Sequence, residues 1–393
     1  MSDPIVIVGA ARTPMGGMLG DLTSVPAAQL GGTAIAAAVK RAGLDPEAVQ
    51  EVIMGNCLMA GQGQAPARQA SLAGGLPLAA GATTISKMCG SGLKAVMLAH
   101  DLITAGSADI MVAGGMENMS AAPYLLPKAR GGMRLGHGQV FDHMFLDGLE
   151  DAYERGKLMG CYADATADNY GFSRAQQDEF AIESLTRAQR ATKEGLFADE
   201  IEPVIISGRK GDTVVEVDEQ PGKAKADKIP QLKPAFAKDG TVTAANASSI
   251  SDGAAALVLM RASEAERRGL KPLARIVGHA SHSHEPEWFT TAPGGAVAKL
   301  LEKTGWSASD VDLWEINEAF AVVTLAAMKD VGISHDVVNV HGGACALGHP
   351  IGASGARILT TLLYALARYE KTRGVASLCI GGGEAVAVAV ERL

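Results

Sequence analysis

A pattern that occurs twice constrains the fold of this 393-residue chain more than any other feature. In each copy a Ser-Gly pair opens a helical segment, and an apolar strand then stops at consecutive glycines and a glutamate. The predicted helices lie at 93–105 and 356–368, and the predicted strands at 109–113 and 375–380. The repeat indicates two similar halves. Coincidence stays open as the alternative, because α/β proteins repeat helix-strand units generically.

Other segments favour a layered α/β enzyme. Residues 5–8 and 51–57 are predicted as buried strands, and residues 27–42 as a helix of small residues. Hydrophobic residues make up 47% of the chain and aromatic residues only 4%, so the core must consist mainly of aliphatic side chains. The 47 glycines allow these elements to pack closely.

Charge and cysteine content exclude several classes of protein. The formal net charge of −8 argues against nucleic acid as the main partner. Five cysteines without a C-x-x-C pair do not describe a disulfide framework and suit a reducing compartment. The apolar segments are short and interrupted, so we expect no membrane span. The chain starts without a targeting pattern and ends in Glu391-Arg392-Leu393, so the expected location is the cytoplasm.

Residues 119–246 differ in composition from the segments on either side. They carry many charges, and the Lys- and Pro-rich stretch 221–234 shows little periodicity. We therefore expect a loop-rich insertion that lies on the α/β body. Insertions of this kind often carry substrate contacts.

Cys89 is the first candidate for chemistry. It precedes Gly90-Ser91-Gly92 and a helix, so its sulfur should lie on a tight strand-to-helix turn like the nucleophile elbow of hydrolases. Free N–H groups at a helix N-terminus stabilise a thiolate, which predicts a lowered thiol pKa. The alternative is a buried structural cysteine, the common fate of a free cysteine.

His349 and Cys379 are the next candidates. His349 lies in the glycine-dense stretch 342–352, where backbone can approach a ligand and the imidazole can point into a cleft. A structural histidine is the plain alternative. Cys379 ends a buried strand just before three glycines, and strand ends are where α/β folds place active sites.

The remaining polar candidates give weaker signals. Asn317 is a polar group inserted in an otherwise apolar segment. His279, His282 and His284 resemble a metal cluster, but the Ser, Glu and Pro residues around them indicate an exposed loop. We therefore predict no metal site.

Four motifs, in this order, resemble those of the thiolase family. They are Lys87-Met88-Cys89-Gly90-Ser91-Gly92, Asn317-Glu318-Ala319-Phe320, Gly348-His349-Pro350-Ile351-Gly352-Ala353-Ser354-Gly355 and Cys379-Ile380-Gly381-Gly382-Gly383. The similarity runs from Ile5 to the C-terminus. The stretch Gly61-Gln62-Gly63-Gln64-Ala65-Pro66-Ala67-Arg68-Gln69 looks most like the biosynthetic acetoacetyl-CoA thiolases.

The resemblance implies a duplicated α/β fold of two similar halves, layered α-β-α-β-α, with an inserted loop domain. Residues 1–118 and 247–270 would form the N-terminal half, 119–246 the CoA-binding insertion and 271–393 the C-terminal half. The resemblance also implies a homodimer or homotetramer. Coenzyme A thioesters would be the substrates, with no metal or redox cofactor.

The same resemblance implies ping-pong chemistry. His349 takes the proton of Cys89, whose thiolate attacks an acyl-CoA, and CoA leaves to give acyl-Cys89. Cys379 then removes an α-proton from acetyl-CoA, and the carbanion attacks the acyl group. His349 and a water held by Asn317 stabilise the enolate. The backbone N–H groups of Cys89 and Gly381 form a second oxyanion hole.

Further residues are implied for substrate binding. Ser248 matches the serine that contacts pantetheine in the family, and Ala319 and Phe320 should line the acyl pocket. The lysines of the insertion are candidates for the nucleotide phosphates, with a solvated loop as the alternative. They are Lys223, Lys225 and Lys228.

The chain departs from the family pattern at several positions. Leu158 stands where the family has a pantetheine-side histidine, and Phe289 where a covering segment has methionine, so both bear on acyl-chain preference. Ser251 stands where asparagine is common. Glu384 follows the triple glycine where glutamine or methionine is usual, close enough to alter the electrostatics near Cys379.

The predicted function is an acetyl-CoA C-acyltransferase, which condenses two acyl-CoA molecules or thiolyses a 3-ketoacyl-CoA. A degradative 3-ketoacyl-CoA thiolase for longer chains stays open. A non-catalytic acyl-CoA binding protein also stays open, although a binder has no need for two cysteines, a histidine and an asparagine together. A decarboxylating ketoacyl synthase on the related fold would want a second histidine in place of Asn317.

Overall fold

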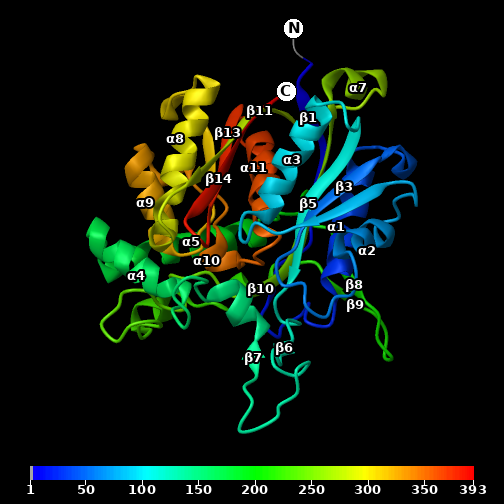
Figure 1. The fold of residues 1–393 in the computed structure, drawn as a ribbon. Coiled ribbons are helices and arrows are strands. Elements are labelled where there is room, and N and C mark those ends of the chain that lie inside the picture. Colours follow the sequence, from blue (N-terminus) through cyan, green and yellow to red (C-terminus); the bar gives the residue numbers. More distant parts are fainter. Residues whose placement is uncertain (1–2) are drawn as a thin grey trace.

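The computed structural model describes residues 3–393. Strands from both ends of the chain join in one large sheet (Figure 1). They are β1 (Ile5–Arg12), β2 (Gly16–Gly17), β3 (Glu51–Gly55), β4 (Gly81–Ile85), β5 (Ile110–Asn118), β10 (Ser251–Arg261), β11 (Ala274–Ser283), β12 (Leu313–Ile316), β13 (Arg373–Ile380) and β14 (Glu384–Arg392).

Helices follow most of these strands. They are α1 (Ala27–Arg41), α2 (Pro66–Ala73), α3 (Ser91–Thr104), α7 (Ala262–Arg267), α8 (Ala292–Thr304), α9 (Ala321–Val331), α10 (Ala344–Leu347) and α11 (Ser354–Arg368). Within residues 3–393, no helix combines the length and the apolar composition that a membrane crossing needs.

The strand order repeats itself. It runs β1-β10-β5-β3-β4 in the first part of the sheet and β11-β14-β13-β12 in the second, and a short β1–β11 pairing joins the two parts. In both parts the third strand of this order has a parallel neighbour on its far side, since β5 pairs with β3 and β13 pairs with β12 in parallel. The last strand of each part, β10 or β14, is antiparallel to both of its neighbours. The twofold sequence pattern thus corresponds to a twofold topology.

Three hydrophobic cores hold five layers together. Helices α3 and α11 lie between the two parts of the sheet, α1 and α2 cover one outer face, and α8 and α9 cover the other (Figure 1). Strand β14 shows how the sequence sets this arrangement, because its side chains alternate between the two faces. Its valines at 386, 388 and 390 join the core around α3 and α11, and its alanines at 385, 387 and 389 join the core beneath α8.

The segment between β5 and β10 is less loop-rich than predicted. It holds β6 (Tyr124–Leu125), β7 (Phe141–Asp142), α4 (Met159–Tyr170), α5 (Arg174–Lys193), β8 (Val204–Ile206), β9 (Thr213–Val215) and α6 (Glu219–Lys223). Helix α5 alone has 20 residues and begins with a capping box made by Ser173 and Gln176. Its buried face includes Phe180 and Leu185, and the many charges on its other face conceal this periodicity in the sequence.

Strand β5 continues beyond its predicted end. The glycines at 114 and 115 were predicted to stop it, but it stays paired with β10 up to Asn118. A Cβ atom on Gly114 would lie 2.1 Å from the backbone oxygen of Ala255, and one on Gly115 would lie 2.0 Å from that of Gly352. These glycines therefore permit close packing of backbone inside the strand.

The predicted exposed loop around the three histidines is also wrong. His279 and His282 lie within β11, which pairs with β14 from Ala274 to Ser283, and His284 follows its end. Pairing with an apolar neighbour strand overrides the polar local composition, since strand formation depends on packing more than on intrinsic preference.

Candidate active site

The predicted site residues from both parts of the sheet meet at one cavity of about 630 Å³. Nine of them line it: Cys89, Leu158, Lys223, Ser248, Phe289, Ala319, Phe320, His349 and Gly381. Cys379 belongs to the apolar cluster that contains Phe289 and Phe320, so it packs against this wall. Asn317 is buried next to the same wall, two residues before Ala319.

A strained turn presents Cys89. Met88 has a φ of 45°, which a residue with a side chain rarely adopts, and α3 begins at Ser91. The Ser91 hydroxyl accepts a hydrogen bond from the Lys87 N–H at 2.8 Å and donates one to the Met88 carbonyl at 2.7 Å. This serine fixes the turn, and the cysteine faces the cavity from its apex.

The Cys89 thiol does not have the lowered pKa that its position before a helix predicted. Burial raises its pKa to about 11, and the nearby backbone N–H groups of Gly381 and of Cys89 itself only partly oppose this effect. Burial outweighs the helix N-terminus because it penalises the charged sulfur directly. Cys89 is therefore a thiol at neutral pH and needs a base to become a nucleophile.

His349 lines the same cavity and has one ring nitrogen without a partner in the described part of the chain. Its Nδ1 lies 2.5 Å from the Ser354 hydroxyl, which itself donates to the Pro350 carbonyl at 2.9 Å. Since that hydroxyl proton is used, we assign a proton to Nδ1, which leaves a lone pair on Nε2. Nε2 is buried and has no hydrogen-bond partner among the described residues. Burial, aided by the charge of Arg357, lowers the His349 pKa to about 3, so the ring is neutral at pH 7.

Cys379 is a second buried thiol beside the first. It occupies the penultimate position of β13, paired with Ala385 of β14, and its side chain is fully buried. Burial raises its pKa well above the usual value, and the charge of a Cys89 thiolate would raise it further. This coupling means that the two sulfurs share one electrostatic environment, where only one of them can readily be ionised.

Asn317 is buried with an unsatisfied side chain. Its backbone N–H donates to the Ser377 carbonyl at 3.0 Å, which attaches it to the end of β13. Its side-chain Nδ2 and Oδ1 are both buried and without a partner within residues 3–393. An amide in this condition is costly unless a water or a ligand bonds to it, so Asn317 marks a polar binding point in an apolar wall.

The glycine loop after β13 brings backbone N–H groups to the cysteine. Gly382 and Gly383 have φ values of 99° and 87°, and a Cβ on Gly383 would lie 2.4 Å from the His284 carbonyl. Glu384 follows them, and its carboxylate is held by the Lys87 ammonium and, at 3.0 Å, by the Ser283 hydroxyl. The charge of Glu384 is therefore paired with that of Lys87.

Glu117 and Ser354 support the site, but the sequence did not identify them. The buried Glu117 carboxylate accepts hydrogen bonds from the backbone N–H groups of Cys57, Leu58 and Gly352 and from the Asn56 side chain, at 2.7–3.1 Å. Burial raises its pKa to about 7, against the effect of these donors. It joins the loop after β3 to the His349 loop. A glutamate at the end of an apolar strand was the only local signal.

The opposite end of the cavity is more polar. The Ser248 hydroxyl and N–H both donate to the Ala319 carbonyl, at 2.9 and 3.0 Å. Lys223 lines the cavity but is exposed and ion-paired with Glu219. A second cavity of about 220 Å³ is lined by Lys225 and Lys228.

The aromatic part of the wall is packed edge to face. Phe236 lies with its ring centroid 6.1 Å from that of Phe320, and Tyr162 lies 6.3 Å from Phe289. Phe236 also lines the cavity, and sequence analysis missed it because it comes from a stretch without periodicity. These rings form an aromatic part of the wall of the cavity that Cys89 also lines.

Comparison with known proteins gives matches along the whole chain. Residues 5–263 match the family described as "Thiolase, N-terminal domain", and residues 270–392 match "Thiolase, C-terminal domain". An acetyl-CoA acetyltransferase of Cupriavidus necator is 52% identical over 390 residues, 99% of this chain and 99% of that protein. One of Chromobacterium violaceum is 51% identical with the same coverage. Acetyl-CoA acetyltransferase 2 of Arabidopsis thaliana is 51% identical over 99% of this chain and 97% of its own length.

Proposed function

We infer that this chain, which belongs to the thiolase family, is an acetyl-CoA C-acetyltransferase that carries its acyl intermediate on Cys89. The observation that carries this proposal is the meeting of three groups at one cavity. They are the Cys89 thiol, the unpartnered Nε2 of His349 and the backbone N–H of Gly381, which opposes the effect of burial on the pKa of the thiol. A neutral base beside a protonated thiol is the arrangement that acyl transfer requires.

In the first half-reaction, Cys89 attacks the thioester carbonyl of acetyl-CoA. His349 takes the thiol proton on Nε2 and returns it to the departing sulfur of CoA, which leaves acetyl-Cys89. Ser354 holds the imidazole through Nδ1, so that Nε2 keeps its orientation during both transfers. The backbone N–H groups of Cys89 and Gly381 would stabilise the oxyanion of the tetrahedral adduct.

In the second half-reaction, His349 takes the proton of Cys379, and the resulting thiolate removes an α-proton from a second acetyl-CoA. His349 then carries a proton on Nε2, which it returns to the Cys89 sulfur when that sulfur leaves the acyl group. The burial that raises its pKa also makes its thiolate a strong base once it forms. The enolate oxygen is stabilised by His349 and by a water on the unsatisfied amide of Asn317. The enolate carbon attacks acetyl-Cys89 and gives acetoacetyl-CoA and the free thiol. Thiolysis is the reverse of these steps.

The two cavities suggest how CoA is bound. We place the pantetheine arm in the larger cavity, along Ser248, because this cavity extends from Cys89 to the insertion. The smaller cavity shares Gln220 and Ser249 with the larger one, and Lys225 and Lys228 line it. These lysines would attract the nucleotide phosphates.

The acyl group should be short. Leu158, Phe289 and Phe320 line the cavity that contains Cys89, and the two phenylalanines are almost fully buried. Because close-packed walls of this kind resist extra methylene groups, we propose a preference for acetyl and acetoacetyl groups over longer chains.

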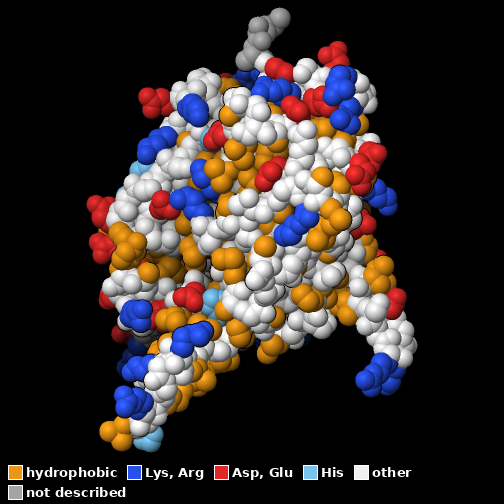
Figure 2. Space-filling view, turned by 45° about the vertical axis from the view of Figure 1, so that its right-hand side comes forward, with side chains coloured by type: hydrophobic (Ala, Val, Ile, Leu, Met, Phe, Trp, Pro, Cys, Tyr) orange, Lys and Arg blue, Asp and Glu red, His pale blue; other side chains and the backbone are white. Residues whose placement is uncertain are grey.

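We also propose a homotetramer. Strand β4 is an edge of the large sheet, and its unpaired edge could join the same strand of a second chain. The β6–β7 hairpin protrudes from the body with apolar side chains among its Lys and Arg residues (Figure 2). Its exposed apolar residues are Tyr124, Leu126, Met133, Leu135 and Val140, and Leu135 is 99% exposed. Such a projection is costly unless a second dimer covers it.

We propose residues 1–118 and 247–270 as one half, 271–393 as the other and 119–246 as the insertion. All five cysteines are free thiols, which suits the cytoplasm.

Thiolysis kinetics test the proposed function. Wild type and Cys89→Ala are compared with acetoacetyl-CoA and 3-ketohexanoyl-CoA as substrates. Wild type should cleave both in a CoA-dependent reaction, with the higher kcat/KM for acetoacetyl-CoA. The kcat/KM of Cys89→Ala should be about a thousandfold lower than that of wild type, or lower still. An equal or higher kcat/KM for the longer substrate would favour the degradative alternative. No cleavage by folded wild type would favour the binding protein.

A further inference from the structure

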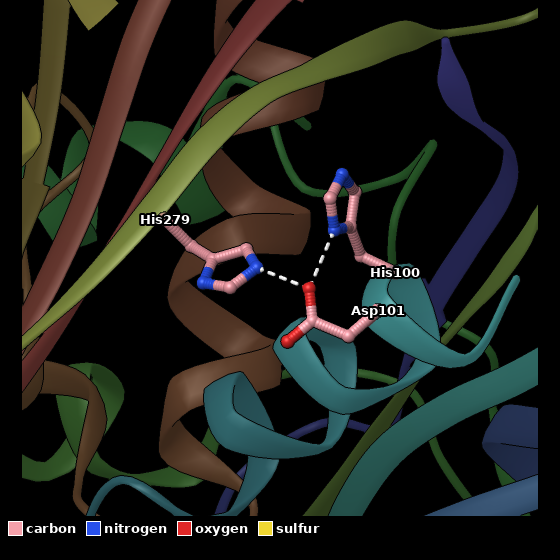
Figure 3. A group of neighbouring side chains, drawn as sticks. All are labelled: His100, Asp101 and His279. Carbon is pink, nitrogen blue, oxygen red and sulfur yellow. Dashed lines mark hydrogen bonds and ion pairs between the residues drawn. The ribbon is translucent and has the colours of Figure 1, made fainter. Parts of the chain in front are cut away.

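Three side chains converge near the end of α3 that is remote from Cys89 (Figure 3). His100 and Asp101 lie on α3, and His279 approaches them from β11. The Asp101 Oδ1 atom lies 3.0 Å from His100 Nδ1 and 2.8 Å from His279 Nε2. All three atoms lie within 4.8 Å of one another, and none of the three residues lines the cavity of the proposed active site.

We propose that His100, Asp101 and His279 bind a divalent first-row transition ion, with Zn²⁺ as the best match. Two imidazole nitrogens and one carboxylate oxygen are ligands that Zn²⁺ accepts, with water completing a tetrahedron. In a tetrahedron with metal–ligand bonds of about 2.0–2.1 Å, neighbouring ligand atoms are about 3.3 Å apart. The two separations from Asp101 Oδ1, 2.8 and 3.0 Å, are slightly shorter than this value, and the two imidazole nitrogens lie within 4.8 Å of each other, so small rotations of the side chains suffice.

The surroundings of the three residues suit an ion that keeps a water ligand. The His279 side chain is 11% exposed and the Asp101 side chain 53%, so the site is buried on the strand side and open on the helix side. The Lys303 ammonium bonds to the His279 carbonyl at 3.2 Å, so it is already partnered.

The ion would join two parts of the molecule. Helix α3 follows the Cys89 turn, whereas β11 is the first strand of the second part of the sheet. His279 and Asp101 are 178 residues apart in the chain, so the ion would close a long loop. Binding to the folded state alone stabilises that state in proportion to the logarithm of the ion concentration. The expected effect is a melting temperature that rises with added ion.

Cobalt(II) titration of the full chain, without a histidine tag, tests the site. Co²⁺ replaces Zn²⁺ in such sites and has visible absorption bands, and a thiolate ligand adds a charge-transfer band in the near ultraviolet. The spectrum therefore distinguishes this site from the cysteines of the active site. Wild type should bind one Co²⁺ per chain with bands of nitrogen and oxygen ligands only. His279→Gln and Asp101→Asn should each weaken this binding at least tenfold.

His282→Gln is the matched control, because His282 lies on the same strand but packs edge to face against His284. It should bind Co²⁺ as wild type does. Binding by wild type with thiolate bands only, or no saturable binding, would overturn the proposal. If His279→Gln and Asp101→Asn both bind Co²⁺ with the affinity of wild type, the proposal is also overturned. The three side chains would then form only a hydrogen-bonded contact between α3 and β11. If His279→Gln fails to fold, the Co²⁺ affinity of Asp101→Asn decides the test. This variant should fold, because the side chain of Asp101 is largely exposed.

Discussion

At the scale of single residues, the site holds a thiol and an imidazole that are both neutral at pH 7. Burial raises the Cys89 pKa to about 11 and lowers the His349 pKa to about 3, so no ion pair forms between them in the resting state. In the proposed mechanism, the nucleophile is generated only when His349 takes the proton of Cys89 during attack. This arrangement protects the cysteine from adventitious electrophiles.

Alkylation of Cys89 should therefore depend steeply on pH. The thiolate fraction of a group with a pKa of about 11 rises about tenfold per pH unit below that value, so the rate with iodoacetamide should rise about tenfold per unit from pH 7 to pH 9. Mass spectrometry of the Cys89 peptide at timed quench points measures this rate. A rate that levels off below pH 8 would mean that the resting enzyme holds a thiolate.

At the scale of elements, close contacts of backbone assemble the site. Strand β5 and the His349 loop touch at Gly115 and Gly352, and Glu117 bonds to the Gly352 N–H at 2.9 Å. The position of His349 therefore depends on a strand 235 residues earlier in the chain. Any change that separates this strand from the loop should move the base away from Cys89.

Gly115→Ala makes such a change. A Cβ would lie 2.0 Å from the Gly352 oxygen, and no flexible side chain can move to relieve this contact. We expect a loss of at least about 3 kcal/mol in the free energy of unfolding, together with a lower kcat. Denaturant unfolding and thiolysis kinetics measure the two effects. Gly131→Ala is the control, since its nearest atom is 4.0 Å away. Similar stability of both variants would contradict this account of the contact.

The sequence predicted the residues that line the cavity better than the residues that hold them in place. Motifs pointed to Cys89 and His349, which the structure brings to one cavity, because both lie in short glycine-rich segments that can be recognised locally. Ser354 and Glu117 were missed, since their function comes from contacts that appear only after folding. The sign of the Cys89 pKa shift was wrong for the same reason, because burial cannot be read from the residues beside it in the chain. His279 was misplaced because strand pairing overrides local polarity.

At the scale of the whole molecule, the site is built from both parts of the sheet. Cys89 comes from the first part, His349 precedes α11 and Gly381 follows β13 of the second, so neither part is sufficient alone. The central α3 and α11 helices share one core, which fixes the relative positions of the residues at their N-terminal ends. The hairpin and the free edge of β4 lie at the periphery and are available for assembly.

Charges on the hairpin should break the proposed tetramer. We expect Met133→Asp with Leu135→Asp to halve the molecular mass to that of a dimer, because burying two carboxylates in an apolar contact is costly. Light scattering after size-exclusion chromatography measures the mass. Val214→Asp is the control, since Val214 is an exposed apolar residue on the separate β8–β9 hairpin. An unchanged tetramer in the double variant would exclude the hairpin as its contact.

Mass spectrometry of the intact protein after incubation with acetyl-CoA alone tests the central claim most directly. We predict one added acetyl group, located on the peptide that contains Cys89, with release of CoA. Added CoA should remove the group, and Cys89→Ala should never acquire it. An acetyl group on another residue would contradict a covalent mechanism at Cys89. So would folded wild type that catalyses thiolysis but carries no acetyl group.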